Sequence, residues 1–457
     1  MKQKEYPVRK GQVLDVEITG YTSEGAGVAR VEGLAVFVAG GICGETLRVR
    51  IAHLGHTAAY ADILKILTPS PARRSSGCIH AGHCGGCVFW HMSYEEELRG
   101  KAQRVTDALN RIGGFSLPGV PITGSPSQTE YRNKAQFPVG QEKNGPVAGF
   151  FRQRTHQVVP IDRCLIQSEE ADKVKDIVTA WMGRHHISVY DEQSHKGLVR
   201  HIYVRNAMAT GQILVCLVIN GDSIPFEKEL VDNLLTHVDN IVSICLSIHK
   251  KRGNFILGDK FAHIYGPGYI EDELCGLRFR LSPRSFYQVN RDQAQQLYAA
   301  AIAQAGLTGQ ETALDLYCGT GTITLALSRH VKKVIGVEII PQAIEDAKDN
   351  AKRNGIENAE FLCADAAQAA EQFAAQGIRP DVIMVDPPRK GLDETVIASM
   401  VQMAPRRIVY VSCDPATLAR DCKRLSEQGY TLTHAEAFDM FPRCAHVESV
   451  VALTRNA

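Results

Sequence analysis

The sequence predicts an α/β fold whose largest part is a mostly parallel sheet covered by helices on both faces. From residue 312 onwards, short apolar runs alternate with Ala-rich segments of helix length; the runs lie at 312–317, 334–338, 359–363, 382–385 and 408–411. Such alternation is typical of parallel strands joined by helical crossovers. Residues 9–68 are rich in Val, Ile, Thr and Gly, and residues 125–275 mix strand-like and helical runs, so we also expect a small β-barrel and a central α+β domain.

The composition indicates a multidomain globular protein. A chain of 457 residues is too long for one ordinary core, and 44% hydrophobic with 22% charged residues is normal for such proteins. The 51 Lys and Arg residues against 50 Asp and Glu give a formal net charge of +1. No overall field therefore attracts nucleic acid, and a polyanion would have to be held by local basic runs. Four such runs are present, at residues 73–74, 131–134, 150–154 and 250–252.

The sequence also favours a cytoplasmic location. No stretch has the apolar length needed to span a bilayer, and the N-terminal residues carry no apolar signal core. Thirteen cysteines without a secretion signal favour a reducing compartment, with metal-binding or catalytic thiols rather than disulfides. We expect no membrane partner, and we expect the protein to act as a monomer.

Residues 1–68 are expected to form the barrel. Alternating runs at 13–18, 35–38 and 46–51 predict strands, and glycines separate them. About five short strands in so few residues favour a barrel of the oligonucleotide-binding kind. The alternative is an accessory barrel that only packs against the rest of the chain. Residues 68–71 (TPSP) then form a linker.

The remaining chain divides into two interleaved domains. Residues 69–93 and 125–275 are expected to form the central domain, which includes a strand over 212–219. Residues 94–124 and 276–457 are expected to form the α/β domain. A helix is predicted over 95–112, ended by Gly113 and Gly114.

Four cysteines in the central domain have the spacing of a metal site. Three form a C-x5-C-x2-C pattern and the fourth is remote; they are Cys78, Cys84, Cys87 and Cys164. This spacing is nearer to that of a [4Fe–4S] cluster than to paired zinc ligands, although zinc and no metal remain alternatives. Gly85 and Gly86 would let backbone donors reach cluster sulfurs. His80 and His83 are expected to lie outside the ligand set.

A Gly-rich turn predicts a nucleotide-type ligand. Residues 315–321 (DLYCGTG) follow the first strand of the α/β domain, and Glu338 ends the second, where an acidic side chain can bind ribose hydroxyls. Nicotinamide dinucleotides usually require the longer G-x-G-x-x-G pattern, and only Gly-Thr-Gly is present. The pattern therefore favours S-adenosylmethionine (AdoMet), with a turn that binds nothing as the alternative.

Three further residues are expected at the ends of strands beside this turn. Asp386 follows the run 382–385, and two prolines fix the backbone after it. Cys413 follows the run 408–411, where a thiolate could add to an electron-poor carbon, although a lone cysteine is more often inert. Glu448 opens the last strand and could act as a general base or be a solvated charge.

Together, these motifs resemble those of the bacterial RNA 5-methyluridine methyltransferase family, specifically its 23S rRNA uracil-C5 enzymes with an N-terminal TRAM domain. The resemblance runs over almost the whole chain. Besides the cysteines, it rests on residues 286–290 (FYQVN), 315–321, 386–389 (DPPR), 412–415 (SCDP) and 446–448 (HVE). A minor departure is Asp414, where many relatives have Asn.

The resemblance implies a Rossmann-like AdoMet-dependent methyltransferase domain, an RNA-binding TRAM-like barrel, and a [4Fe–4S] cluster in the central domain. It implies Cys413 as the nucleophile, Glu448 as the base, and contacts to AdoMet from Gln288, Tyr317, Glu338 and Asp386. The cluster ligands would be Cys78, Cys84, Cys87 and Cys164. Because the bacterial tRNA branch typically lacks both cluster and barrel, the expected partner is 23S rRNA, with tRNA as the alternative.

The chemistry of uracil requires the same groups. C5 of uracil is a poor nucleophile, but addition of a thiolate at C6 places negative charge on C5, which can then take a methyl group. A base must afterwards remove the C5 proton, and the uridine must leave its stack, most easily from looped RNA. Two other classes compete: an iron–sulfur oxidoreductase, which would need a pyrophosphate loop, and a non-catalytic RNA-binding protein, which would not need the thiol at Cys413.

Overall fold

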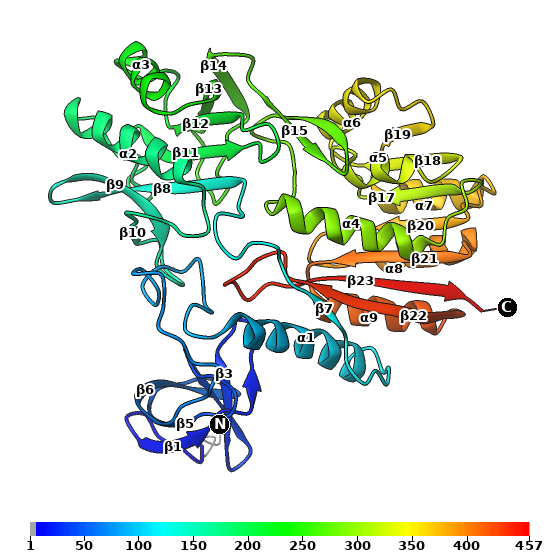
Figure 1. Cartoon of the computed structure of the whole chain (residues 1–457), viewed down its shortest axis with the longest axis horizontal. Coiled ribbons are helices and arrows are strands. Elements are labelled where there is room, and N and C mark those ends of the chain that lie inside the picture. Colours follow the sequence, from blue (N-terminus) through cyan, green and yellow to red (C-terminus); the bar gives the residue numbers. More distant parts are fainter. Residues whose placement is uncertain (1–5, 457) are drawn as a thin grey trace.

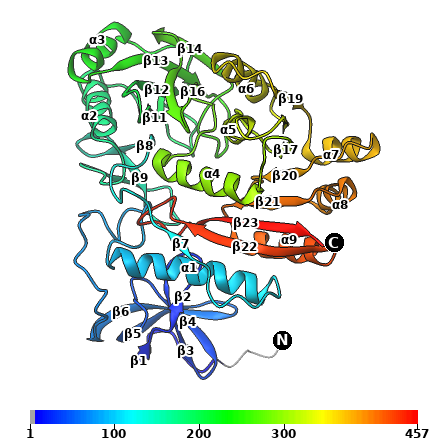
Figure 2. The ribbon, with the colours of Figure 1, turned by 45° about the vertical axis from the view of Figure 1, so that its right-hand side comes forward.

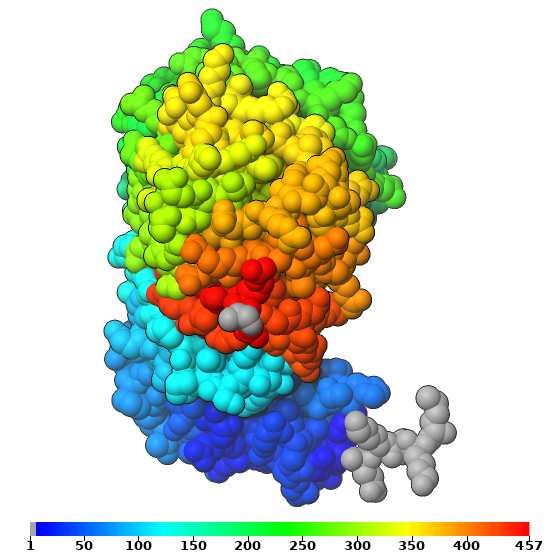
Figure 3. Space-filling view, turned by 90° about the vertical axis from the view of Figure 1, so that its right-hand side faces the viewer, coloured from blue at the N-terminus to red at the C-terminus, as the bar shows by residue number. Residues whose placement is uncertain are grey.

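The computed structural model describes residues 6–456, which fold into an N-terminal barrel, a central domain and a C-terminal α/β body (Figure 1). In the view of Figure 2, the helix α1 (Tyr94–Arg111) lies between the barrel and the C-terminal body. The space-filling view has the same order, with the barrel in blue at the bottom and the segment around α1 in cyan above it (Figure 3). None of the helices within residues 6–456 is long and apolar enough to cross a membrane.

The barrel is a six-stranded sheet in the order β1-β5-β6-β4-β3-β2. Its strands are β1 (Val13–Glu17), β2 (Gly20–Tyr21), β3 (Gly27–Val31), β4 (Leu34–Val38), β5 (Thr46–Leu54) and β6 (Ala58–Thr68). Alternate residues point inwards, so that Val16, Ala29, Val36 and Val49 share one core. The runs expected at 13–18, 35–38 and 46–51 coincide with β1, β4 and β5.

Polar contacts fix the barrel to the rest of the molecule. Glu45, which is fully buried, accepts two hydrogen bonds from the Arg73 guanidinium, at 2.5 and 2.6 Å. The Tyr21 hydroxyl donates to Glu96 on α1. Arg104, also on α1, donates from Nη1 both to the carbonyl of Ser23 in a barrel loop and to the carbonyl of Ala445. The barrel is therefore held against α1 and against the loop that precedes the last strand.

The central domain is a seven-stranded sheet in the order β10-β9-β8-β11-β12-β13-β14. Its elements are β8 (Lys134–Glu142), β9 (Gly145–Phe151), β10 (Val158–Pro160), α2 (Glu169–Arg184), β11 (Val199–Asn206), β12 (Ile213–Ile219), α3 (Glu227–His237), β13 (Ile241–Ile248) and β14 (Lys260–Tyr265). The helices α2 and α3 cover one face, against residues such as Ile202 and Val204. The other face, with Tyr203, joins the core of the C-terminal body.

The C-terminal body is built on an eight-stranded sheet in the order β19-β18-β17-β20-β21-β23-β22-β7. The strands are β7 (Ile122–Thr123), β17 (Thr312–Leu316), β18 (Lys333–Glu338), β19 (Ala359–Cys363), β20 (Val382–Val385), β21 (Arg407–Ser412), β22 (Tyr430–Phe438) and β23 (Glu448–Arg455). The five from β17 to β21 are parallel, and β23 is antiparallel to both its neighbours. The five runs predicted as parallel strands correspond to these five.

Helices cover both faces of this sheet, as expected. The hairpin of β15 (Ile270–Leu274) and β16 (Leu277–Leu281) packs with α4 (Arg291–Ala305) and α5 (Thr322–Ser328) on one side, and α6 (Pro341–Arg353) lies against β16 and β19. The other side is covered by α7 (Ala366–Ala375), α8 (Glu394–Met403) and α9 (Pro415–Ser426). The strand order reverses between β17 and β20. In open parallel sheets, ligands bind at such a reversal beside the carboxyl ends of the strands, which form the carboxyl edge of the sheet.

Candidate active site

The turn between β17 and α5 is a tight cradle at that edge. Three of its residues have positive φ: Tyr317 at 72°, Gly319 at 55° and Gly321 at 83°. At Gly321 an added Cβ would lie 3.1 Å from the Cβ of Ala347, so the turn needs a glycine there for space as well as for conformation. Tyr317 has no such freedom, and a strained non-glycine residue of this kind is often found where a ligand binds.

Glu338, the last residue of β18, is tied to this turn. Its carboxylate accepts hydrogen bonds from the backbone amides of Gly319 at 3.2 Å and Ile340 at 3.0 Å. Beside it, Ile339 and Ile340 are 59% and 56% exposed, although both are large apolar residues. The strand end thus presents a carboxylate next to an uncovered apolar surface.

Asp315 lies under the turn, completely buried. Its carboxylate accepts a 2.5 Å hydrogen bond from the Thr324 hydroxyl, while its second oxygen, Oδ1, has no hydrogen-bond partner among the described residues. Burial, opposed by the hydrogen bond from Thr324 and supported by the nearby charges of Asp386 and Glu338, raises the pKa of Asp315 to about 7. The sequence analysis placed Asp315 in the motif but gave it no role of its own.

Asp386 and Gln288 approach the same edge from different elements. Asp386 follows β20 and is partly buried, and burial raises the pKa of its carboxyl to about 7. Gln288 is 8% exposed in the segment that leads into α4, and its backbone carbonyl accepts a 2.8 Å hydrogen bond from the Asn133 side chain.

Cys413 and Glu448 are brought together by the antiparallel pairing of β21 and β23. Ser412 is the Cα partner of Ser449, so the next position on each strand places Cys413 beside Glu448. Cys413 is partly exposed, and Glu448 is 4% exposed. A thiol and a carboxyl group therefore lie side by side where β21 and β23 meet the carboxyl edge.

Burial, together with nearby negative charges, keeps both groups protonated more strongly than usual. Burial, and then the negative charges of Glu448 and Asp386, raise the pKa of Cys413 to about 11, with Arg389 acting against them. Burial and Asp386 likewise raise the pKa of Glu448 to about 8, again opposed by Arg389. Arg389 is thus a site residue that the sequence analysis did not single out, although it directly follows the Asp-Pro-Pro segment.

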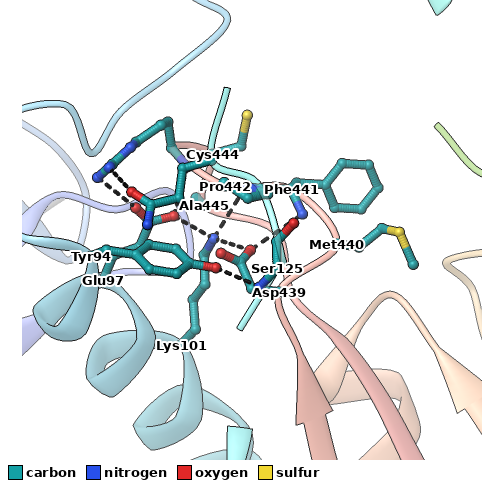
Figure 4. A network of polar contacts seen from close by, with 12 residues as sticks. Tyr94, Glu97, Lys101, Ser125, Asp439, Met440, Phe441, Pro442, Cys444 and Ala445 are labelled. Atoms are coloured by element: carbon teal, nitrogen blue, oxygen red, sulfur yellow. Dashed lines mark hydrogen bonds and ion pairs between the residues drawn. The ribbon is translucent and has the colours of Figure 1, made fainter. Parts of the chain in front are cut away.

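A buried ion-pair network holds the loop that connects β22 to Glu448. Lys101 on α1, 2% exposed, donates to Glu97 at 2.7 Å, to Asp439 at 2.6 Å and to the carbonyl of Phe441 at 3.1 Å (Figure 4). The backbone amide of Arg443 also donates to Glu97, at 2.7 Å. The loop is therefore anchored to α1 just before the strand that carries the carboxylate beside Cys413.

The four cysteines of the sequence motif line a single cavity of about 570 Å³. It lies between the central domain and the C-terminal body, and Arg389 and His446 also line it. A fifth thiol, Cys444, lies in the same cavity, where it donates a 3.1 Å hydrogen bond to the carbonyl of Gly86. The sequence analysis did not identify Cys444 as a site residue.

The thiols share this cavity without converging as ligands. Within residues 6–456, no group of three or more Cys, His, Asp or Glu side chains is placed to hold a metal ion. None of the cysteines described is in a disulfide. One detail agrees with the expectation for Gly85 and Gly86, because the Gly86 amide donates to the Cys84 sulfur at 3.4 Å. The donor set and its common cavity suit thiolate ligation, and the [4Fe–4S] assignment stays a prediction.

Comparison with known proteins identifies the chain. Residues 93–456 match the family model described as tRNA (uracil-5-)-methyltransferase, and residues 7–64 match the TRAM domain. The chain belongs to the tRNA (uracil-5-)-methyltransferase family. It is accordingly an AdoMet-dependent RNA uracil-5-methyltransferase with an N-terminal TRAM domain, as the resemblance in the sequence implied.

Relatives of this uracil-5-methyltransferase match it from end to end. It is 42% identical to an uncharacterized RNA methyltransferase of Halalkalibacterium halodurans over 99% of both chains, and 40% identical to one of Clostridium tetani over 99% of this chain and 98% of that one. Among solved structures, it resembles the Pyrococcus abyssi tRNA (uracil-54, C5)-methyltransferase in complex with S-adenosyl-L-homocysteine. That match has a TM-score of 0.78 and 26% identity, and it covers 96% of this chain and 99% of the other.

In this methyltransferase, the structure brings both predicted catalytic residues and most of the predicted AdoMet-binding residues to one edge of the sheet. Tyr317, Glu338, Asp386, Cys413 and Glu448 all lie there, next to the strand-order reversal. Their individual roles stay predictions.

Proposed function

We propose that the protein methylates C5 of a uridine in 23S rRNA through a covalent intermediate on Cys413, with Glu448 as the base. The observation that carries the proposal is the β21–β23 register, which places the Cys413 thiol beside the Glu448 carboxyl group at the edge where the Gly-rich turn and Asp386 also lie. This is the set of groups that uracil chemistry requires: a thiol, a base, and a neighbouring place for the methyl donor.

The residues around the turn fit AdoMet. Gly319 and Gly321 let backbone approach the ligand, and Glu338 offers a carboxylate for ribose hydroxyls. The exposed side chains of Ile339 and Ile340 offer an apolar surface for a base. We place Gln288, Tyr317 and Asp386 at the remainder of the ligand. AdoMet supplies the methyl group as an electrophile.

The side chains then act in a fixed order. The Cys413 sulfur forms a bond to C6, and the electron pair of the C5–C6 double bond moves towards C5. C5 then takes the methyl group as the bond from that methyl group to the sulfonium sulfur breaks and its electron pair stays on sulfur. Because its pKa is raised to about 8, Glu448 must first lose its own proton to solvent. It then takes the proton from C5, the double bond reforms, and the bond from C6 to Cys413 breaks to return the thiolate. Because the pKa of Cys413 is raised, its thiol proton must pass to solvent before or during addition. Arg389 is the nearby cation that favours the thiolate.

Ribosomal RNA is proposed as the substrate on two features that the bacterial tRNA branch typically lacks. These are the four cysteines, which line one cavity beside the site, and the TRAM barrel. We propose that these cysteines hold a [4Fe–4S] cluster, that the target is a looped uridine flipped out of its stack, and that the protein works as a cytoplasmic monomer. The second candidate is the same reaction on tRNA. It is favoured by the Pyrococcus abyssi enzyme, whose match extends over 96% of this chain, barrel included.

Mapping of 5-methyluridine in RNA tests this function. Ribosomal and transfer RNA from cells lacking the protein should be compared with RNA from cells that carry it, and the purified protein should restore the missing methyl group in vitro. Loss of 5-methyluridine from 23S rRNA alone supports the proposal. Loss from tRNA alone would establish the second candidate, and no loss from either RNA would contradict both.

A further inference from the structure

A cluster of three basic side chains lies on the face of the central sheet that joins the C-terminal body. Lys134 on β8 and Arg205 on β11 are direct cross-strand partners, and Arg132 comes two residues before Lys134. Arg132 and Lys134 line the cysteine cavity, whereas Arg205 is 2% exposed behind it. Arg132 and Lys134 come from a basic run of the sequence that the proposed reaction leaves without a role.

The described residues offer these cations no carboxylate. Arg205 donates from Nη2 to the carbonyl of Ser285 at 2.8 Å, but its Nε and Nη1 are buried without a hydrogen-bond partner. Burial, and then the positive charges of Arg205 and Arg132, lower the pKa of Lys134 to about 8. Like charges directly opposite each other on two strands are destabilising, and so is a buried charge without a partner. Lys134 and Arg205 therefore form an unfavourable pair that an anion would relieve, whereas Arg132 already lies near the sulfurs of Cys87 and Cys444.

The cluster lies next to the reaction site. The carbonyl that Arg205 binds belongs to Ser285, three residues before Gln288. Asn133, between Arg132 and Lys134, donates from its side chain to the Gln288 carbonyl and from its backbone amide to the Val289 carbonyl, both at 2.8 Å. The cavity that Arg132 and Lys134 line also reaches Arg389 and His446, which neighbour the Cys413–Glu448 pair. An anion bound here would lie beside the path to the thiol.

We propose that Arg132, Lys134 and Arg205 form a phosphate site that binds a phosphodiester of the RNA strand next to the uridine being methylated. The proposal rests on the proposed function, which makes RNA the ligand. A phosphodiester carries a net negative charge and several acceptor oxygens, which suits guanidinium and ammonium donors. The amino-acid end of AdoMet is a poorer match, because its ammonium group and its sulfonium would both face a cluster of cations.

Stability and binding should change in opposite directions when the cluster is reduced. Lys134→Met and Arg205→Met remove a charge that is unfavourable in the free protein, so each should keep or raise Tm. Each should also weaken binding of a short RNA hairpin carrying the mapped uridine by roughly tenfold or more, as expected for loss of a charge-assisted hydrogen bond. The RNA-binding constant K falls with salt concentration. Removing one phosphate contact should make the negative slope of log K against log salt shallower by about 0.7 for single-stranded RNA. The matched control is Lys143→Met, an exposed lysine in the turn after β8.

A neutral phosphate analogue identifies the anion. A methylphosphonate beside the mapped uridine should weaken binding to the unsubstituted protein but have little further effect on Lys134→Met. AdoMet affinity should be the same in all these proteins. Inorganic phosphate should raise the Tm of the unsubstituted protein more than chloride at equal ionic strength, and Lys134→Met should lose this difference.

Several results would overturn the phosphate site. One is that both variants bind RNA as tightly as the unsubstituted protein. Another is that they bind AdoMet more weakly with RNA binding unchanged, which would assign the cations to the cofactor carboxylate. A lower Tm for both variants without any effect of the methylphosphonate would show a structural role. If the unsubstituted protein methylates no uridine, the proposed function fails and the phosphate site with it; if it does methylate one, a negative result concerns the phosphate site alone.

Discussion

Ser412 pairs with Ser449 across the antiparallel ladder of β21 and β23. The pairing fixes the positions one step further along both strands, where Cys413 and Glu448 lie. Residues separated widely in the sequence are thus held by backbone hydrogen bonds rather than by flexible loops. Rigid support of this kind is what a reaction with a nucleophile and a base on the same substrate requires.

Substitution of this pair should divide the reaction into two steps. Cys413→Ala should abolish methyl transfer and leave AdoMet binding intact, because the thiol acts only on uracil. Glu448→Gln should allow addition and methylation but block release, so that a protein–RNA adduct resistant to denaturant accumulates on gels. The adduct should be absent when Cys413 is also replaced. Turnover by the Cys413→Ala protein would show that the mechanism is not covalent.

Burial of Glu448 should make a contribution to the stability of the free protein that falls as pH rises. The pKa of Glu448 is about 8 in the folded protein against an ordinary value of 4.5, so the folded state keeps a proton that the unfolded state has lost. Between these two pH values, Glu448 should reduce the free energy of unfolding by up to about 1.4 kcal/mol per pH unit. Asp386 and Asp315 act in the same direction up to about pH 7.

Urea denaturation at several pH values measures this effect. Glu448→Gln should remove this contribution, which changes the slope of the unfolding free energy against pH by up to about 1.4 kcal/mol per pH unit between pH 5 and 8. The exposed Glu371→Gln should leave that slope unchanged. An identical pH dependence in both variants would show that Glu448 is not protonated in the folded protein.

Glu338→Ala should weaken AdoMet binding by about tenfold, as expected for loss of a charged hydrogen-bond partner. Calorimetric titration with AdoMet gives the affinity, and Tm should be followed in parallel because Glu338 also binds the amides of Gly319 and Ile340. Glu345→Ala, on the exposed side of α6, is the control. Unchanged affinity in Glu338→Ala would place the ribose contact elsewhere.

Lys101→Met should be strongly destabilising, because it leaves Glu97 and Asp439 buried without their cation. The expected loss is about 3–5 kcal/mol of unfolding free energy. The control is Lys173→Met, which breaks the exposed ion pair with Glu169 and should cost at most about 1 kcal/mol. Similar costs for the two variants in urea denaturation would mean that the buried network contributes no more than a surface pair.

Anaerobically purified protein should be brown and contain about four irons per chain, as ligation of one [4Fe–4S] cluster by four thiolates implies. Iron and zinc should be measured together by elemental analysis. Serine at any of Cys78, Cys84, Cys87 or Cys164 should lower iron content and folding yield, and the matched control is serine at the exposed Cys363. Stoichiometric zinc without iron would contradict the cluster.

The parallel sheet was predictable because each of its strands is a continuous apolar run followed by a helix. Cys413 and Asp386 could be placed at its edge for the same reason, since each directly follows such a run. Contacts between distant segments could not be predicted, because they leave no local pattern in the sequence. Lys101 and Asp439 are 338 residues apart, and nothing in the sequence around either indicates the other.

The same limit applies to β7 and to the cysteine cavity. The two residues of β7, Ile122 and Thr123, are too few to show a strand pattern, and they pair with β22 only because α1 returns the chain to that edge. The presence of Cys444 beside Cys87 depends on the loop held by Lys101. The sequence spacing therefore indicated which thiols to consider but not that a fifth joins them.

The Arg104 guanidinium joins a barrel loop to the loop before Glu448 through two carbonyls, those of Ser23 and Ala445. An RNA that touches both the barrel and Cys413 would therefore meet two contact points whose separation the protein sets in advance. A uridine at another distance from the RNA segment that contacts the barrel could not reach the thiol. Selection among the many uridines of a folded RNA would therefore depend on the distance between that segment and the uridine as well as on local sequence.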